Sequence, residues 1–287
     1  MERMVLVIGA SGGVGAEVMR QLTAGGARVR ALVRSAKSAQ EVRGIAAGVV
    51  LGDLRDIPSL RTALTDVDHV FLATPQGPTA EYFTGALVEA STDLSPHIVR
   101  PSLLGADANS SVDLAKYHGR ADRMLQQSGL PYTILRPHFL MQNFLGTFSD
   151  TIGSDGAFGA PMKDGAIGIV DMRDVAAVAA ECLRGPGYAG RTYGITGPDA
   201  MTFHDLAGHI SEAAGRHVRY LPQSSQQALE SMTNAGMKVE LAERLVQFYG
   251  LYASGHTNLV TNAVREVTGV SPRTFSLFAH EYAPLWG

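Results

Sequence analysis

The chain has 287 residues, of which 45% are hydrophobic, and a formal net charge of -3 at pH 7. This length suits two unequal α/β lobes with a sizeable core, and the weakly acidic balance offers no basic field that would attract nucleic acid. The single cysteine, Cys182, excludes an internal disulfide, and no apolar run approaches the roughly 20 residues that a membrane span requires. We therefore expect a cytoplasmic protein that binds a small-molecule substrate, with no nucleic acid and no membrane as partners. The oligomeric state stays undetermined, with a homodimer as one alternative.

The N-terminal segment predicts a strand, a glycine-rich turn and a helix. Residues 4–8 are all apolar and mostly β-branched, which is typical of a strand buried on both faces. Three glycines follow: the first would allow a tight turn, the second a close approach to a pyrophosphate, and the third packing of a helix against the strand. Between a strand and a helix, this triplet is the dinucleotide-binding fingerprint. The expected cofactor contacts are Gly9, Ser11, Gly12, Gly13, Val14 and Gly15.

The end of the second predicted strand, residues 27–33, indicates which dinucleotide is bound. NAD sites usually place a carboxylate about 20 residues after the glycines to hold the adenosine ribose, whereas an arginine accommodates the 2′-phosphate of NADP. Here that position holds Arg34, with Lys37 close behind and no carboxylate before Glu41. We therefore predict NADP(H) as the cofactor, with Arg34 and Lys37 near its phosphate. The alternative interpretation of Arg34 is a solvated surface side chain.

Further strands are expected at residues 48–54 and 69–74, alternating with helices at residues 59–64 and 80–91. This alternation predicts a parallel sheet, in which ligands lie across the carboxyl ends of the strands. At one such end, Asp53 would accept a hydrogen bond from the adenine amino group, and at another, Thr74 and Pro75 would border the pyrophosphate or nicotinamide. Leu54 is a further expected cofactor contact. Plain turn chemistry explains the same residues equally well.

The next segment predicts a fifth strand at residues 97–104, a helix from near Leu114 and a sixth strand at residues 132–136. Pro101 has no N–H to donate, so the fifth strand should already be ending there. The apolar, aromatic residues after the sixth strand would form one wall of a pocket over the nicotinamide, and core packing is the competing interpretation. The expected substrate-pocket residues are His138, Phe139, Met141 and Asn143, and Ser102 and Pro137 are further expected cofactor contacts.

The remaining chain predicts a return to the sheet and then a second lobe. Residues 151–163 are rich in glycine and predict a mobile loop, residues 166–170 a strand, and residues 191–196 another strand after a helix. Thr202 would cap the next helix, and a short strand at residues 217–221 would follow it.

Taken together, these elements define the expected fold class and domain boundaries. The sequence predicts an α/β protein with a Rossmann-type, doubly wound parallel sheet and a smaller, mainly helical C-terminal lobe. The NADP-binding domain is expected at residues 1–150, with residues 165–197 returning to its sheet. The substrate lobe is expected at residues 198–287.

Motifs spread over nearly the whole chain match one known family. They include Gly-Ala-Ser-Gly-Gly-Val-Gly at residues 9–15, Ala-Thr-Pro at residues 73–75 and Ser-Gly-Leu-Pro-Tyr-Thr-Ile-Leu-Arg-Pro at residues 128–137. In these motifs the chain resembles the NmrA-like family of atypical short-chain dehydrogenases/reductases, especially its quinone-oxidoreductase-like members. The resemblance implies the fold and NAD(P)H binding. It leaves the activity open, because the family includes reductases as well as NADP-sensing proteins without known turnover.

The chain lacks the Tyr-x-x-x-Lys pair that ordinary short-chain dehydrogenases use as a proton donor. In the related isoflavone-reductase-like group, a lysine one helix before the Gly-x-Pro-Tyr-Thr strand does this work. Counting back from residue 129 places His118 there, with Tyr117 and Lys116 beside it. The His118 imidazole would either protonate or polarise a substrate oxygen, and a helix dipole would disfavour the imidazolium if His118 lay in the first helical turn. Ordering of a loop at the pocket rim is the alternative.

These features predict an NADPH-dependent reductase of a small quinone, enone or ketone. The nine histidines show no metal-ligand spacing, so no metal is expected and hydride chemistry belongs to the cofactor. Two alternatives remain: an NADP(H)-binding redox sensor without turnover, and a redox-neutral epimerase or isomerase. The missing Tyr-Lys pair favours the sensor.

Overall fold

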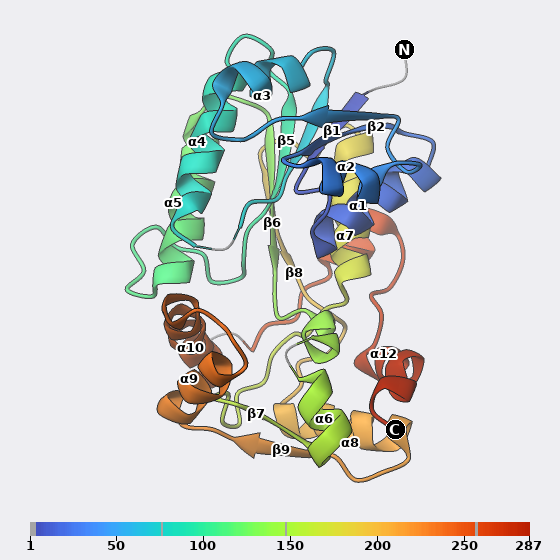
Figure 1. Ribbon diagram of the computed structural model, residues 1–287, viewed down its shortest axis with the longest axis vertical. Helices are drawn as coiled ribbons and strands as arrows, with labels where there is room; N and C mark the ends of the chain where they lie inside the picture. The colour runs from blue at the N-terminus through green and yellow to red at the C-terminus, as the bar shows by residue number, and fades with distance from the viewer. Residues whose placement is uncertain (1–3, 76, 147, 256–257) are drawn as a thin grey trace. The chain divides into compact units, whose positions relative to one another are not determined.

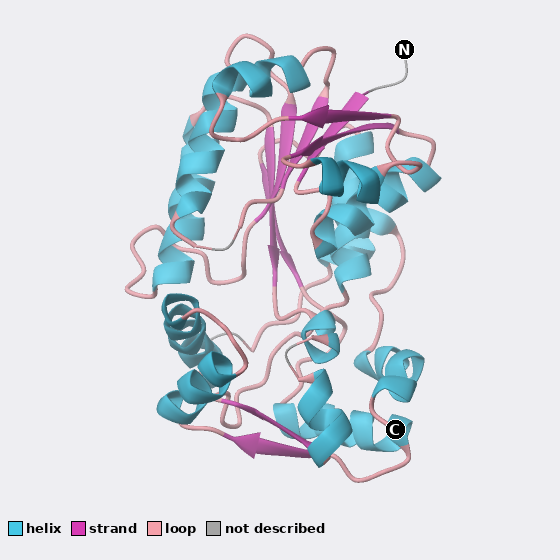
Figure 2. Cartoon of the chain, in the orientation of Figure 1, coloured by secondary structure: helices cyan, strands magenta, loops and turns pink. Residues whose placement is uncertain are grey.

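The structure is a computed structural model that describes residues 4–75, 77–146, 148–255 and 258–287 (Figures 1 and 2). The chain forms two compact units, which we call unit 1 and unit 2. Unit 1 consists of Met1–Ser110, Ala115–Arg136 and Met172–Gly194, and unit 2 of Ser111–Leu114, Pro137–Asp171 and Ile195–Gly287. The contacts therefore divide the chain at residue 137, whereas the sequence placed residues up to 150 with the nucleotide-binding part.

Unit 1 is built on a seven-stranded sheet, counted over the described residues, in the order β3-β2-β1-β4-β5-β6-β8. Its strands are β1 (Met4–Ile8), β2 (Arg28–Val33), β3 (Gly48–Leu51), β4 (His69–Leu72), β5 (His97–Pro101), β6 (Tyr132–Pro137) and β8 (Arg191–Ile195). The central strand β1 pairs in parallel with β2 and with β4, so that Val5 lies opposite Val29 and His69. The strand order reverses beside β1, and ligands of such sheets bind outside the carboxyl ends of the strands at that point.

Helices cover both faces of this sheet, as a doubly wound α/β fold requires. Figure 1 shows α1 (Gly13–Ala24), α2 (Ala36–Val42) and α7 (Met172–Arg184) on one side, and α3 (Ile57–Ala63), α4 (Thr79–Ser91) and α5 (Asp113–Gln127) on the other. Within these layers α1 packs on α7, and α3 packs on α4. The predicted fold class is thereby confirmed. No described helix combines the length and the apolar character that crossing a membrane requires.

The apolar periodicity that predicted α1 corresponds to its buried face. Val18 and Leu22 are completely buried against the sheet, while Val14 is half-buried. On the opposite layer, a cluster of buried aliphatic residues joins the strands to α3, α4 and α5 through Leu60, Leu87, Leu125 and their neighbours. Cys182 on α7 is also fully buried, and this burial raises the pKa of its thiol to about 12, so it serves as a small apolar core residue as expected.

Unit 2 contains a second sheet, of which the sequence predicted one strand, at residues 217–221. Two short strands, β7 (Ala157–Ala160) and β9 (Arg219–Pro222), pair in parallel. The helices of this unit are α6 (Ser149–Asp155), α8 (Phe203–Ala214), α9 (Ser225–Asn234), α10 (Val239–Ala253), α11 (Ala263–Thr268) and α12 (Phe275–Tyr282), with the short 3-10 helices η1 (Met141–Leu145) and η2 (Ala283–Leu285). Thr202 caps α8 through a capping box with Asp205, which confirms the predicted helix start.

Two predictions in this region are wrong. Residues 151–163, predicted as a mobile loop, contain most of α6 and all of β7. Residues 166–170, predicted as a strand of the large sheet, make only isolated bridges, Leu140 to Val170 and Ile167 to Met201. The apolar run is genuine, but its residues are buried inside unit 2 and pair with that unit rather than with the seven-stranded sheet.

Candidate active site

The turn between β1 and α1 requires glycine at two positions for reasons internal to the fold. Gly9 has φ +84°, and a Cβ there would lie 2.9 Å from the Cβ of Ala73. The Gly9 carbonyl oxygen then accepts a 3.0 Å hydrogen bond from the Gly12 N–H, which closes the tight turn. At Gly15, the first buried residue of α1, an added Cβ would overlap the Gly9 carbonyl oxygen. These two glycines let α1 start directly against the end of β1.

Gly12 differs, because the protein itself leaves room for a side chain there. An added Cβ would make one ordinary contact, at 3.4 Å from the Gly9 carbonyl oxygen, and the residue is exposed at the turn. No side chain caps the N-terminus of α1, whose first N–H groups face this turn. The open space at Gly12 is therefore available to a ligand, and the uncapped helix end favours an anionic one.

We expect Gly15→Ala to destabilise the protein by about 1–3 kcal/mol or more, since the added methyl group meets backbone rather than a flexible side chain. Urea unfolding followed by circular dichroism measures this change. Gly208→Ala is the matched control: this exposed helical glycine has no atom within 4 Å of the added Cβ, so the substitution should be neutral or slightly stabilising. Equal stability of Gly15→Ala and the wild type would contradict the packing role.

A cavity of about 310 Å³ opens at the carboxyl ends of β1, β2 and β4. Eight of the predicted cofactor contacts line it together: Gly9, Ser11, Gly12, Arg34, Asp53, Leu54, Thr74 and Pro75. The Thr74 hydroxyl oxygen is buried there and has no hydrogen-bond partner among the described residues. A buried hydroxyl without a partner is costly unless a ligand or water satisfies it. The residues that line the cavity therefore fit a polar ligand such as a dinucleotide.

Asp53, which lines this cavity, forms an ion pair with Arg55 that sequence reasoning missed. Arg55 clamps both oxygens of the Asp53 carboxylate, with Nε at 3.0 Å and Nη2 at 2.6 Å. These hydrogen bonds, with a smaller contribution from the charge of Arg34, lower the pKa of Asp53 to about 2, so its carboxylate is ionised. Arg55 lies two residues after Asp53, and nothing in the sequence distinguishes this close pair from a solvated turn. Asp53 keeps lone pairs for an adenine amino group but shares them with Arg55.

The structure does not bring every predicted cofactor contact to the cavity. Lys37 is an exposed residue of α2, and Gly13 and Val14 belong to the first turn of α1 beside the lining residues. Ser102 is buried and donates a 2.9 Å hydrogen bond to Asp122, so its hydroxyl is occupied by the protein. Pro137 belongs to unit 2.

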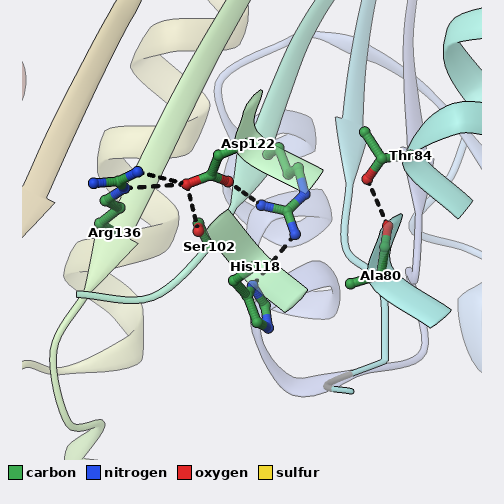
Figure 3. A network of polar contacts seen from close by, with 7 residues as sticks. Ala80, Thr84, Ser102, His118, Asp122 and Arg136 are labelled. Carbon is green, nitrogen blue, oxygen red and sulfur yellow. Dashed lines mark hydrogen bonds and ion pairs between the residues drawn. The ribbon is translucent and has the colours of Figure 1, made fainter. Parts of the chain in front are cut away.

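A buried ionic network joins β5 to α5 in unit 1 (Figure 3). Arg100 lies within β5 and is completely buried. It forms an ion pair with Asp122 of α5, which is itself only 1% exposed. The second carboxylate oxygen of Asp122 accepts from Ser102 and from Arg136, whose Nη2 lies 2.9 Å away. Sequence reasoning missed this network. An arginine between the apolar residues of a predicted strand was the available signal, because unpaired charges are almost never buried.

His118 joins this network at its edge. It is the sixth residue of α5 and so lies in the second helical turn rather than the first, and its side chain is 4% exposed. Its Nδ1 lies 3.3 Å from Nη2 of Arg100, while its buried Nε2 has no hydrogen-bond partner within the described part of the chain. Burial first, and the Arg100 charge second, lower the pKa of His118 to about 3. The imidazole is therefore neutral, for a different reason than the expected helix dipole.

The other two predicted catalytic residues do not converge on His118. Lys116 and Tyr117 are half-buried neighbours on the same helix. Successive α-helical residues project about 100° apart, so the three side chains leave α5 in different directions. His118 contacts the buried network through Arg100.

The four predicted substrate-pocket residues all belong to unit 2. The His138 ring stacks on Tyr252 with centroids 4.7 Å apart, and Phe139 contacts the rings of Phe144, Phe203, Tyr249 and Tyr252. Met141 is completely buried, and Asn143 is half-buried within η1. Phe139 and Met141 thus have the environment of core residues, which was the competing interpretation of this aromatic stripe. Among the residues with described placement, no group of three or more potential ligands could hold a metal ion.

Comparisons with known proteins give a family context for this geometry. The sequence profile of the NmrA-like family matches residues 1–277. The chain is 36% identical to the NAD(P)H azoreductase of Xenophilus azovorans, with 99% of each chain covered. It is 33% identical to the (4-alkanoyl-5-oxo-2,5-dihydrofuran-3-yl)methyl phosphate reductase of Streptomyces griseus, with 98% of each covered. The NADPH-dependent quinone oxidoreductase QOR2 of Escherichia coli, complexed with NADPH, has the same fold, with a TM-score of 0.88 at 24% identity over 97% of this chain and 99% of that chain.

Proposed function

Since the chain belongs to the NmrA-like family and is an NAD(P)H-dependent oxidoreductase of that family, we propose that it uses NADPH to reduce a small conjugated acceptor of the quinone, enone or ketone class. One observation carries this proposal. A neutral, buried imidazole with an unpartnered ring nitrogen lies in the same unit as the cavity that the glycine-rich turn and Arg34 line. Such a nitrogen is suited to hydrogen-bond an oxygen that gains negative charge during reduction.

The cavity residues fit NADPH through contacts of three kinds. Gly12 and the uncapped end of α1 would hold the pyrophosphate, and the orphaned Thr74 hydroxyl would bond one of the cofactor's polar groups. Arg34 would hold the adenosine 2′-phosphate, since a guanidinium can donate two hydrogen bonds to phosphate at once. When bound, the reduced nicotinamide supplies the hydride.

The relatives named above are consistent with this substrate class. One acts on azo compounds, one on an alkanoyl-substituted dihydrofuranone, and one on quinones. All three acceptors are conjugated, and each places new electron density on an oxygen or nitrogen after hydride addition. A single hydrogen-bond donor such as His118 serves every member of this group.

Turnover of a small acceptor panel tests the proposal. We expect NADPH absorbance to fall on mixing the protein with p-benzoquinone, an azo dye such as methyl red, or a conjugated enone. No oxidation of NADPH with any of them, while calorimetry still detects NADPH binding, would contradict the reductase and favour a nucleotide sensor. Interconversion of a substrate with no net NADPH consumption would instead indicate an isomerase.

We expect Arg34→Ala to weaken NADPH binding by about 10- to 150-fold, because a bidentate charge-assisted contact is worth about 1.5–3 kcal/mol. NADH lacks the 2′-phosphate, so its affinity should hardly change. Isothermal titration with both nucleotides measures the two effects. Arg28→Ala is the matched control, since Arg28 is an exposed arginine at the opposite end of the same strand and should leave both affinities unchanged. Equal losses for NADPH and NADH would show that Arg34 does not recognise the 2′-phosphate.

A further inference from the structure

We propose that Arg100 is a positioning residue that holds His118 as a neutral imidazole with its proton on Nε2, so that His118 acts on the substrate as a fixed hydrogen-bond donor and not as a proton source. The assignment of the tautomer rests on contacts within unit 1 alone. Its use toward a substrate rests on the reductase function proposed above.

The tautomer follows from the donors and acceptors at one contact. A guanidinium carries N–H donors and no acceptor, so the 3.3 Å contact from Arg100 Nη2 requires Nδ1 of His118 to accept. Nδ1 therefore carries no proton. A neutral imidazole has one N–H, which must then lie on Nε2. Nε2 is the buried atom that has no partner among the described residues. Its N–H is therefore a donor that the protein itself leaves unused.

The guanidinium that imposes this tautomer is itself held in place. Arg100 is 0% exposed, and its Nη1 is paired with one oxygen of Asp122. The other Asp122 oxygen is held by Ser102 and by the Nε and Nη2 atoms of Arg136. Because the guanidinium is a rigid planar fork, fixing Nη1 also fixes the direction of Nη2 toward His118. Figure 3 draws this chain of contacts from Arg136 through Asp122 to His118.

The charge of the network matches this role. Two guanidiniums face one carboxylate, which leaves an excess positive charge beside a neutral imidazole. Positive charge at Nδ1 polarises the ring and strengthens Nε2–H as a donor. In the familiar carboxylate–histidine pair, the carboxylate accepts from Nδ1–H and makes Nε2 a better base, so the arrangement here is the reverse.

The reduction balances without a proton from His118. Bound NADPH would supply a hydride to a carbon of the conjugated acceptor and leave as NADP⁺, so that the π-electron pair would move to the carbonyl oxygen. That oxygen accepts a hydrogen bond from Nε2–H, and water then supplies the proton that completes the hydroxyl group. A neutral imidazole that keeps its proton can stabilise the oxyanion in every turnover without being reset.

Nitrogen-15 NMR of histidine-labelled protein tests the proposal without any substrate. We expect the His118 ring, identified by its absence from the His118→Gln spectrum, to show a protonated Nε2 and an unprotonated Nδ1. Arg100→Met should remove the tautomer preference and give averaged ring shifts. Arg123→Met is the matched control, because Arg123 is an exposed arginine on α5 outside the network and should leave the spectrum unchanged.

The outcomes separate this inference from the proposed function. A proton on Nδ1 in the wild type would overturn the inference even if Arg100→Met fails to fold, as would an Arg100→Met spectrum identical to that of the wild type. With p-benzoquinone as the probe, Arg100→Met should lower kcat by about 10- to 100-fold with a similar KM, since removing a positioning group weakens the donor without removing it. If the wild type shows the Nε2–H tautomer but reduces no acceptor, the proposed function fails and the tautomer assignment stands.

Discussion

Replacing His118 by alanine should lower kcat for p-benzoquinone reduction by about 10²–10³-fold and leave the Kd for NADPH unchanged. This is the usual cost of deleting one preorganised donor to a developing oxyanion, and His118 lies outside the set of residues that line the cavity at Gly12 and Arg34. Single-turnover stopped-flow oxidation of bound NADPH measures the chemical step, and fluorescence titration measures the nucleotide affinity.

Two further variants sharpen the test of His118. His118→Gln keeps an N–H donor that cannot titrate, so it should retain part of the rate that alanine loses. His280→Ala removes an exposed histidine in α12 and serves as the control that should behave as the wild type. A His118→Ala protein with near wild-type kcat would show that the imidazole takes no part in the reaction, and Tyr117 would be the next residue to test.

Replacing Asp122 by alanine should destabilise the protein by about 3–5 kcal/mol, because it leaves the fully buried Arg100 charge without its partner. Denaturant unfolding followed by tryptophan fluorescence and circular dichroism measures the change. The comparison is Asp93→Ala, which removes the partner of Arg61 in a 3.4 Å ion pair whose acidic side chain is 76% exposed. Exposed pairs contribute about 0–1 kcal/mol, so this variant should unfold almost as the wild type does.

The charge explanation of the Asp122 effect can be separated from loss of volume. The double variant Arg100→Met with Asp122→Leu removes both charges and keeps most of the buried volume, so it should be considerably more stable than Asp122→Ala alone. If Asp122→Ala costs no more than Asp93→Ala, or if the double variant is the less stable of the two, burial of an unpaired Arg100 charge is not what limits stability.

The architecture of unit 1 could be predicted because local sequence encodes it. Alternating apolar strands and amphipathic helices specify a parallel sheet, and the carboxyl ends of its strands must meet at one edge. For this reason residues as distant in the chain as Gly12, Arg34, Asp53 and Thr74 were expected together, and they do line one cavity. Each of these residues is positioned by the strand immediately before it.

The parts that could not be predicted depend on contacts between distant segments. The run at residues 166–170 has the composition of a strand, but it forms only bridges to Leu140 and Met201 within unit 2. Phe139 follows a strand end, where a pocket wall and a core residue have the same composition, and only the surrounding rings of unit 2 distinguish them. The Arg100–Asp122 pair joins a strand to a helix 22 residues later, and no local pattern connects the two.

A crystal structure of the protein with NADP⁺ and a hydroquinone tests the central claim most directly, because it places the ligand atoms beside the residues assigned to them. We expect the 2′-phosphate on the Arg34 guanidinium, the pyrophosphate at Gly12, and a hydroquinone oxygen about 2.7–3.2 Å from Nε2 of His118. Nε2 of His118 bonded to a protein acceptor instead, with the hydroquinone held elsewhere, would contradict the role assigned to this histidine.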